Sequence, residues 1–177
     1  MADVTTNALR GIVKTLSDVV VPAIPADDPL ALQELKMVVR YLNFCRERID
    51  HLYARARYEL GFYAGLAAKC AALLAQADTP RSRELAGLIA QAELLLAQPG
   101  APIGALREQH QEIMTRLSTL LGEVKDADTL ADLERIVVIG SAEITAFDRS
   151  WYAPLELERF PDQLRPLASF SPMLASA

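Results

Sequence analysis

Apolar residues recur every three or four positions from Leu32 to Leu74, and no proline interrupts them. Such spacing places one stripe along one face of an α-helix. We therefore expect residues 29–76 to form one very long helix, or two helices joined by a bend near Arg55–Arg57. The stripe has one polar member, Arg46, among Leu32, Leu35, Val39, Leu42, Ile49, Tyr53, Ala56, Leu60, Tyr63, Ala67, Cys70 and Leu74.

Four further amphipathic helices are expected on either side of this segment. The first begins near Thr5 or Thr6 and ends before Pro22 and Pro25. Asp28-Pro29 supplies a cap and a first-turn proline for the long segment. The remaining three helices are separated by turn signals and are expected from Asp78-Thr79-Pro80 to about Gln98, from Ile103 to about Val124, and from the turn at 125–128 to Trp151.

Prolines change the pattern after Pro154. Pro161, Pro166 and Pro172 follow at intervals too short for a stable helix. Residues 153–177 are expected to form an extended tail that packs onto the helices or onto a partner. The predicted fold is an all-α antiparallel bundle of about five helices in a single domain, residues 1–177, with this proline-rich tail.

Composition and charge narrow the class of protein. Of the 177 residues, 51% are hydrophobic and only 6% aromatic, which favours helices. The net charge of −5 argues against a nucleic-acid-binding module. Cys45 and Cys70 lie too far apart on a straight helix for a disulfide, so we expect free thiols. Neither a leader-like segment nor an apolar run of membrane-spanning length is recognised, so the expected location is the cytoplasm, without membrane contact.

The length of the second segment predicts self-association. A straight helix over 29–76 would be roughly 70 Å long and would extend beyond neighbours of about 20 residues. Its apolar stripe would then remain uncovered, and a two-fold dimer is the simplest way to cover it.

The most densely charged stretch runs from Arg46 to Glu59. Arg46 with Asp50 and Arg55 with Glu59 have the spacing of ion pairs on one helix face, which is typical of a solvated surface. Two alternatives stay open, namely recognition of an anion by arginines beside tyrosines, or contact with a partner protein. The candidate ligand or partner residues are Arg46, Arg48, His51, Tyr53, Arg55, Tyr63, His110 and Trp151.

Two of these candidates lie on apolar stripes. Arg46 must either extend its head group to the edge of the core or form a buried ion pair. His110, on the stripe of the fourth helix, is expected to be hydrogen-bonded in the core, and a catalytic role is the alternative.

Motifs for chemistry are not recognised. The sequence has no Glu-x-x-His motif, no nucleophile elbow and no glycine-rich phosphate loop, and it contains two histidines. We therefore predict no catalytic residue, no metal site and no cofactor.

The segment Leu16–Leu42 resembles a known family. It contains Leu-Ser-Asp-Val-Val-Val-Pro-Ala-Ile-Pro followed by Asp-Pro-Leu-Ala-Leu-Gln-Glu-Leu-Lys-Met-Val-Val-Arg-Tyr-Leu. This resembles the opening of a bacterial helical domain of unknown function, encoded near acyl-CoA dehydrogenases and aminoglycoside-phosphotransferase-like kinases. The resemblance implies an accessory role near acyl-CoA metabolism and transfers no catalytic residue.

Taken together, the sequence predicts a non-enzymatic, homodimeric helical protein that acts through protein–protein contacts. The alternative function is binding of a small apolar or acyl ligand between helices.

Overall fold

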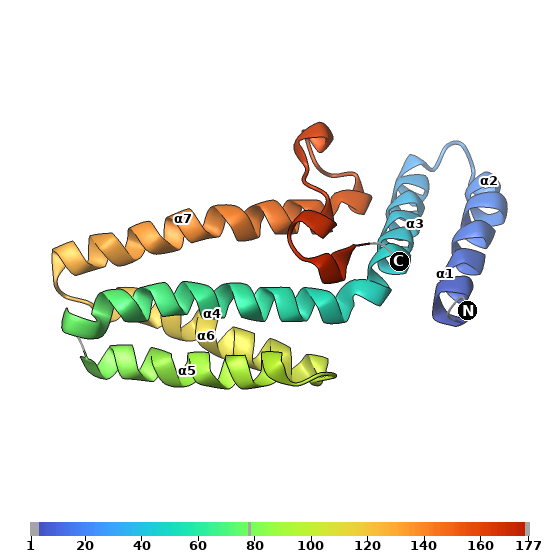
Figure 1. Cartoon of the computed structure of the whole chain (residues 1–177). Helices are drawn as coiled ribbons and strands as arrows, with labels where there is room; N and C mark the ends of the chain where they lie inside the picture. The colour runs from blue at the N-terminus through green and yellow to red at the C-terminus, as the bar shows by residue number, and fades with distance from the viewer. Residues whose placement is uncertain (1–3, 78, 176–177) are drawn as a thin grey trace. The chain divides into compact units, whose positions relative to one another are not determined.

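The computed structural model describes residues 4–77 and 79–175, which contain helices and no strand. The predicted all-α fold with five helical segments is confirmed (Figure 1). Asp78, in the expected cap of the third segment, lies outside the described residues. The helices are α1 (Val4–Thr15), α2 (Val21–Ala23), α3 (Pro29–Arg48), α4 (Leu52–Ala77), α5 (Thr79–Ala97), α6 (Ile103–Glu123) and α7 (Ala127–Trp151).

The long second segment is helical from Pro29 to Ala77 but changes at Ile49–His51, a single 3-10 turn between α3 and α4. It begins as predicted, because the Ala31 amide donates to the Asp28 carboxylate (3.0 Å) and Pro29 occupies the first turn. Arg55–Arg57, the expected position of a break, lies inside α4. The chain divides into two compact units at this turn: unit 1 comprises residues 4–51 and 149–165, and unit 2 comprises residues 52–148 and 166–175.

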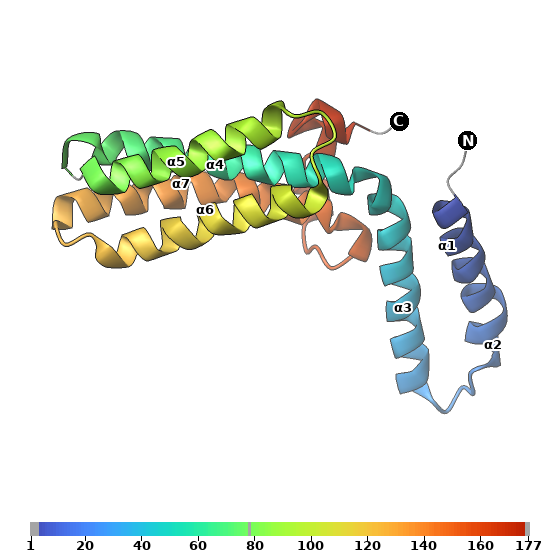
Figure 2. The same cartoon turned by 90° about the horizontal axis from the view of Figure 1, so that it is seen from below.

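Unit 2 contains α4, α5 and α6 lying side by side, together with α7 up to Asp148 (Figures 1 and 2). The predicted stripe of α4 is buried here except for Tyr53 and Tyr63, which are partly buried, and its alanines Ala56 and Ala67 let neighbouring helices approach closely. The most fully buried side chains of the core are Ala56, Leu60, Ala67, Cys70, Leu74, Leu85, Ala92, Leu106, Ile113, Leu120 and Leu133.

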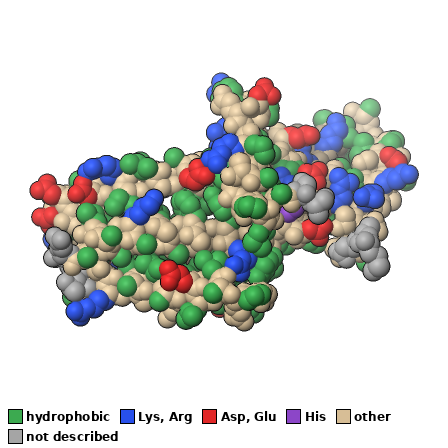
Figure 3. Space-filling model, in the orientation of Figure 1, with side chains coloured by type: hydrophobic (Ala, Val, Ile, Leu, Met, Phe, Trp, Pro, Cys, Tyr) green, Lys and Arg blue, Asp and Glu red, His purple; other side chains and the backbone are tan. Residues whose placement is uncertain are grey.

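Between α4 and α7, unit 2 has a groove of about 350 Å³. Figure 3 shows hydrophobic side chains along this hollow. Leu73 and Ile136 line it, and Lys69, Asp132 and Arg135 add charge. Closer contact occurs at Gly140, where an added Cβ would lie 2.7 Å from Cδ1 of Leu66. The missing side chain at 140 therefore gives Leu66 its space.

The tail after α7 contains only short 3-10 turns among its described residues: η3 (Ala153–Leu155), η4 (Pro161–Gln163), η5 (Leu167–Ser169) and η6 (Pro172–Leu174). Residues 166–175 pack onto the bundle of unit 2, as predicted. The Phe170 ring meets Tyr58 and Phe147 edge-on, at centroid distances of 6.0 and 5.4 Å, and Leu174 is buried.

Unit 1 is built on a helical hairpin. Its first arm is α1 continued by a π-helical turn, η1 (Leu16–Val20), and by α2, and α3 returns beside it (Figures 1 and 2). In residues 149–165, Arg149 donates two hydrogen bonds of 2.9 Å to the Glu158 carboxylate. These bonds, with one from the Phe160 amide, lower the pKa of Glu158 to about 2.

None of the helices in residues 4–77 and 79–175 combines the length and apolar character needed to cross a membrane.

Two glycine substitutions test the packing of α7 on α4. Gly65→Ala, at an exposed site with open space for a Cβ, should raise the free energy of unfolding by about 0.5–1 kcal/mol through helix propensity. Gly140→Ala gains the same propensity but crowds Leu66, so it should lower the free energy of unfolding by about 1 kcal/mol. Urea denaturation measures both, and equal stabilisation by the two alanines would contradict this packing.

Candidate functional site

Three of the eight candidate residues meet in a polar cluster of unit 2. Arg55 and Tyr63 come from α4 and His110 from α6, and Glu59 of α4 and Asp148 of α7 complete the cluster. The predicted Arg55–Glu59 ion pair is confirmed at 2.7 Å, and Arg55 also lies 3.4 Å from the Asp148 carboxylate. The Tyr63 and His110 rings stack with centroids 4.6 Å apart. Arg55 and Tyr63, eight residues apart on α4, thus contact α7 and α6 respectively.

Burial controls the protonation of this cluster. It lowers the pKa of His110, raises that of Asp148 and raises that of Tyr63. The Nε2 atom of His110 is buried and has no hydrogen-bond partner in the part of the chain that the structure describes. The cluster joins three helices of unit 2 through polar and ring contacts.

Arg48 and Trp151 form a second contact, within unit 1. The Nε atom of Arg48 donates to the Trp151 carbonyl (2.8 Å), Nη2 lies 3.5 Å from the Ser150 carbonyl, and the guanidinium lies 5.4 Å from the centroid of the Trp151 ring. These carbonyls end α7, where helices lack intrahelical donors and favour cations. The interpretation as a solvated face therefore does not hold for Arg48, whose role is to cap α7.

Tyr53 also holds a helix end. Its hydroxyl accepts from the Gly100 amide (3.1 Å) and from Arg57 (3.3 Å), and Arg57 in turn donates to the Leu96 carbonyl at the end of α5. Arg57 was part of the charged stretch but was not singled out, because sequence spacing does not reveal a contact between residues about 40 positions apart. His51, by contrast, lies in the 3-10 turn between α3 and α4.

Arg46 extends its head group to the edge of the core, which is the first of the two roles expected for it. It is partly exposed, pairs with Glu47 (3.8 Å) and reaches an open cavity of unit 1. The residue is therefore at the edge of the hairpin and not in a buried ion pair.

The hairpin carries exposed apolar surface. The sequence predicts such surface instead along the stripe of the long second segment. None of the described residues of α1, η1, α2 or α3 is fully buried. Several large apolar side chains are instead exposed, at 38–82% of their full area. They are Val4, Ile12, Val19 and Val20 on the first arm and Leu30, Val38 and Tyr41 on α3.

Most of these side chains lie on one side of the hairpin. At about 100° per residue, Val4 and Ile12 share a sector of α1, and Val38 and Tyr41 share a sector of α3. Each sector is about a quarter-turn from the half-buried residues that face the other helix, such as Leu9 and Leu35. Since the helices are antiparallel, both sectors turn to the same side. We call this surface, formed by Val4, Ala8, Ile12, Leu30, Val38, Tyr41 and Cys45, the hairpin face.

In residues 4–77 and 79–175, no three His, Cys, Asp or Glu side chains are grouped so that they could hold a metal ion.

The cap on α7 predicts that Arg48→Ala will lower the free energy of unfolding by about 1–3 kcal/mol, because hydrogen bonds from a charged donor to two carbonyls are lost. Arg10→Ala, at an exposed arginine of α1, is the control and should change it by less than about 0.5 kcal/mol. Chemical denaturation compares them, and equal effects would contradict the capping role.

The polar cluster predicts a pH dependence that belongs to His110. Its pKa is lowered on folding, so near pH 6.5 the unfolded chain binds more protons and the free energy of unfolding falls as the pH falls. His110→Phe keeps a stacking ring and should flatten the melting temperature between pH 7.5 and 5.5. The other histidine provides the control, because His51→Gln should keep the slope. If the melting temperature of His110→Phe still falls with falling pH as in the wild-type chain, other groups cause this dependence.

Comparison with known proteins leaves the family open. No family model, no curated protein and no solved structure matches this chain.

Proposed function

We propose that this chain is a non-enzymatic helical protein that acts through protein–protein contacts, and that its first contact is with a second copy of itself through the hairpin face. The single observation that carries the proposal is a helical hairpin without a buried residue that exposes Ile12, Val38 and Tyr41. A helix with an apolar stripe must bury it against another element.

The two halves of the long segment support a specific location for the contact. On α4 the stripe is covered, because Leu60, Ala67 and Leu74 have no exposed surface. On α3 the same stripe is only half-buried at Leu35 and Leu42, and a second apolar row is exposed beside it. The expected uncovered stripe is therefore absent from α4, and the proposal rests instead on the second exposed row of α3 together with α1.

The size of the hairpin face fits a dimer. The 20-residue α3 is about 30 Å long, and two helices side by side are roughly 20 Å wide. The resulting area of about 600 Å² approaches the roughly 800 Å² that each partner buries in a standard interface. Interfaces that bury much less than about 600 Å² on each partner are more typical of weak encounters.

Symmetry favours a second copy as the occupant. A two-fold axis brings identical patches together, so an apolar face contacts an equally apolar face. Two hairpins joined in this way form a four-helix arrangement whose core the single hairpin lacks. Glu34 is exposed and lies one turn before Val38 in the same sector of α3, so the hairpin face includes one carboxylate.

A reducing compartment fits the same proposal. Cys45 is an exposed free thiol on the hairpin face, and Cys70 is a buried one. Exposed thiols of this kind are typical of the cytoplasm, which we propose as the location.

A charge on the hairpin face tests the dimer. Light scattering after size exclusion should give a dimer for the wild-type chain at tens of micromolar. Val38→Glu should weaken the dimer at least 100-fold, because two-fold symmetry places two new charges in one interface.

The matched control is Val138→Glu, at an exposed valine of α7 in unit 2. It should leave the dimer intact. A monomeric wild-type chain, or a dimer that survives Val38→Glu but not Val138→Glu, would overturn the assignment to this face.

A further inference from the structure

Unit 1 contains an open cavity of about 700 Å³ on the other side of α3. Its walls are α3, the first arm of the hairpin and the turn that follows α7. On α3, Lys36, Arg40 and Asn43 lie about half a turn from Val38, so the cavity and the hairpin face are on opposite sides. The lining residues are Ser17, Val21, Lys36, Val39, Arg40, Asn43, Arg46, Glu47, Ala153, Pro154 and Glu156.

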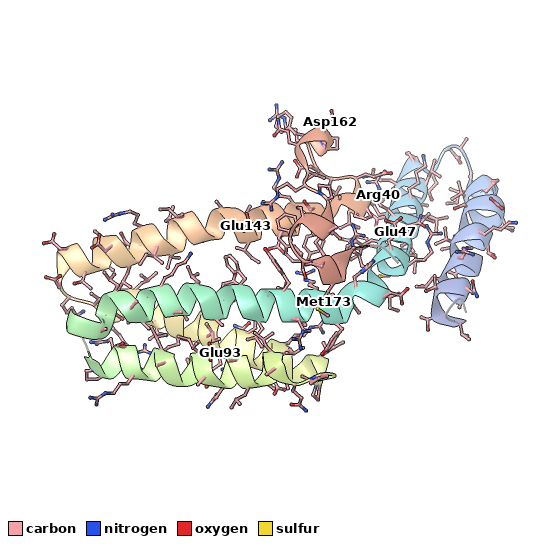
Figure 4. The ribbon with its side chains drawn as sticks, in the orientation of Figure 1. Arg40, Glu47, Glu93, Glu143, Asp162 and Met173 are labelled. Atoms are coloured by element: carbon pink, nitrogen blue, oxygen red, sulfur yellow. The ribbon has the colours of Figure 1, made fainter. Side chains whose placement is uncertain are left out.

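The charges around the cavity favour an anion. Three cations, Lys36, Arg40 and Arg46, face two carboxylates. Both arginines project from α3, where Figure 4 labels Arg40 beside Glu47. An arginine offers a planar pair of donors that matches a carboxylate or a phosphate.

The existing partners of these arginines are weakly held. Arg40 contacts Glu156 at 3.3 Å, but 73% of the Glu156 side chain is exposed. Arg46 contacts Glu47 at 3.8 Å, with about half of that side chain exposed. Exposed ion pairs of this kind contribute little, so an incoming anion can replace the carboxylate on Arg40.

Arg116 of unit 2 provides the contrast. It lines a groove between α5 and α6, and its guanidinium holds Glu84 at 2.7 Å and Glu123 at 3.2 Å. Both carboxylates are close enough for hydrogen bonds. The arginine of that groove is therefore held by two carboxylates of the protein, whereas Arg40 and Arg46 of the unit 1 cavity each have one, at 3.3 and 3.8 Å.

Two irregular backbone segments border the same cavity. Ser17 lies in the π-helical turn η1, and such turns often occur at functional sites. Glu156 has a positive φ of 54°, which is strained for a residue with a side chain. These two irregular segments shape two separate walls of the cavity.

Part of the lining is apolar, namely Val21, Val39, Ala153 and Pro154. Sites for small molecules combine such surface with a few polar groups that orient the ligand. We propose that this cavity binds a small organic anion, a carboxylate or phosphate monoester with a short apolar part, whose charged group contacts Arg40 and Arg46. This site is independent of the dimer proposed above.

Calorimetric titration of the full chain tests the proposal with three probes: butyl phosphate, pentanoate and inorganic phosphate. At least one of the two organic anions should bind with a submillimolar Kd, and the better one identifies the head group. Inorganic phosphate should bind at least tenfold more weakly than butyl phosphate if the phosphate ester is preferred. No heat from either organic anion up to several millimolar would overturn the proposal.

Substituting each partner of the Arg40–Glu156 ion pair distinguishes a role in binding the anion from a role in holding the turn. Arg40→Gln should raise the Kd of the better probe at least tenfold, because the donor is lost. Glu156→Gln should lower it two- to tenfold, because the competing carboxylate is removed. If the pair served only to hold the turn, both substitutions would weaken binding, and this result would overturn the assignment.

Arg10→Gln is the matched control, since it removes the same charge from an exposed position outside the cavity. It should leave the Kd within twofold of the wild-type value. An equal loss in Arg10→Gln and Arg40→Gln would mean that the anion responds only to net charge, and would also overturn the proposal. Repeating the titration on Val38→Glu should give an unchanged Kd whether or not the chain is a dimer.

Discussion

The other structural properties of this protein depend on the burial of the apolar row on α4. Leu60, Ala67 and Leu74 are completely covered by other parts of unit 2, because alanines in the same row let the neighbouring helices approach. The row continues onto α3 with the same spacing, but α3 has only one helical arm beside it. One periodic sequence pattern thus produces a closed core in one unit and an open hairpin in the other.

The C-terminal ends of α5 and α7 are stabilised by side chains distant in the sequence, whereas the start of α3 has the cap that the local sequence predicts. Arg48 donates to the last carbonyls of α7, and Arg57 donates to the Leu96 carbonyl at the end of α5. The Tyr53 hydroxyl accepts from the Gly100 amide in the loop that follows. Charged groups that satisfy orphan carbonyls also interact with the helix dipole, so each contact contributes twice. This explains why a highly charged stretch, Arg46–Glu59, contributes to stability and is not simply a solvated surface.

Helix periodicity and proline positions predicted the number of helices, most of their ends and the row of core residues on α4. The predicted stripe includes both Leu42 and Leu60 with the same spacing, yet Leu60 is buried and Leu42 is only partly buried. A stripe specifies which face of a helix is apolar, but it does not specify whether another element is present to cover it. Contacts of Arg48 with residues about 100 positions away, the π-helical turn at Ser17 and the strained backbone of Glu156 depend on tertiary structure and have no local pattern.

The hairpin of unit 1 has opposite properties on its two sides, and this division connects the two proposals. The hairpin face on one side is mostly apolar, which is why we propose that an identical surface covers it and excludes water. The other side carries arginines whose carboxylate partners are exposed, so it gains most from an anion with better geometry. A hairpin with no fully buried residue has little internal packing energy of its own. The two proposals therefore assign chemically different partners to the two sides of the hairpin.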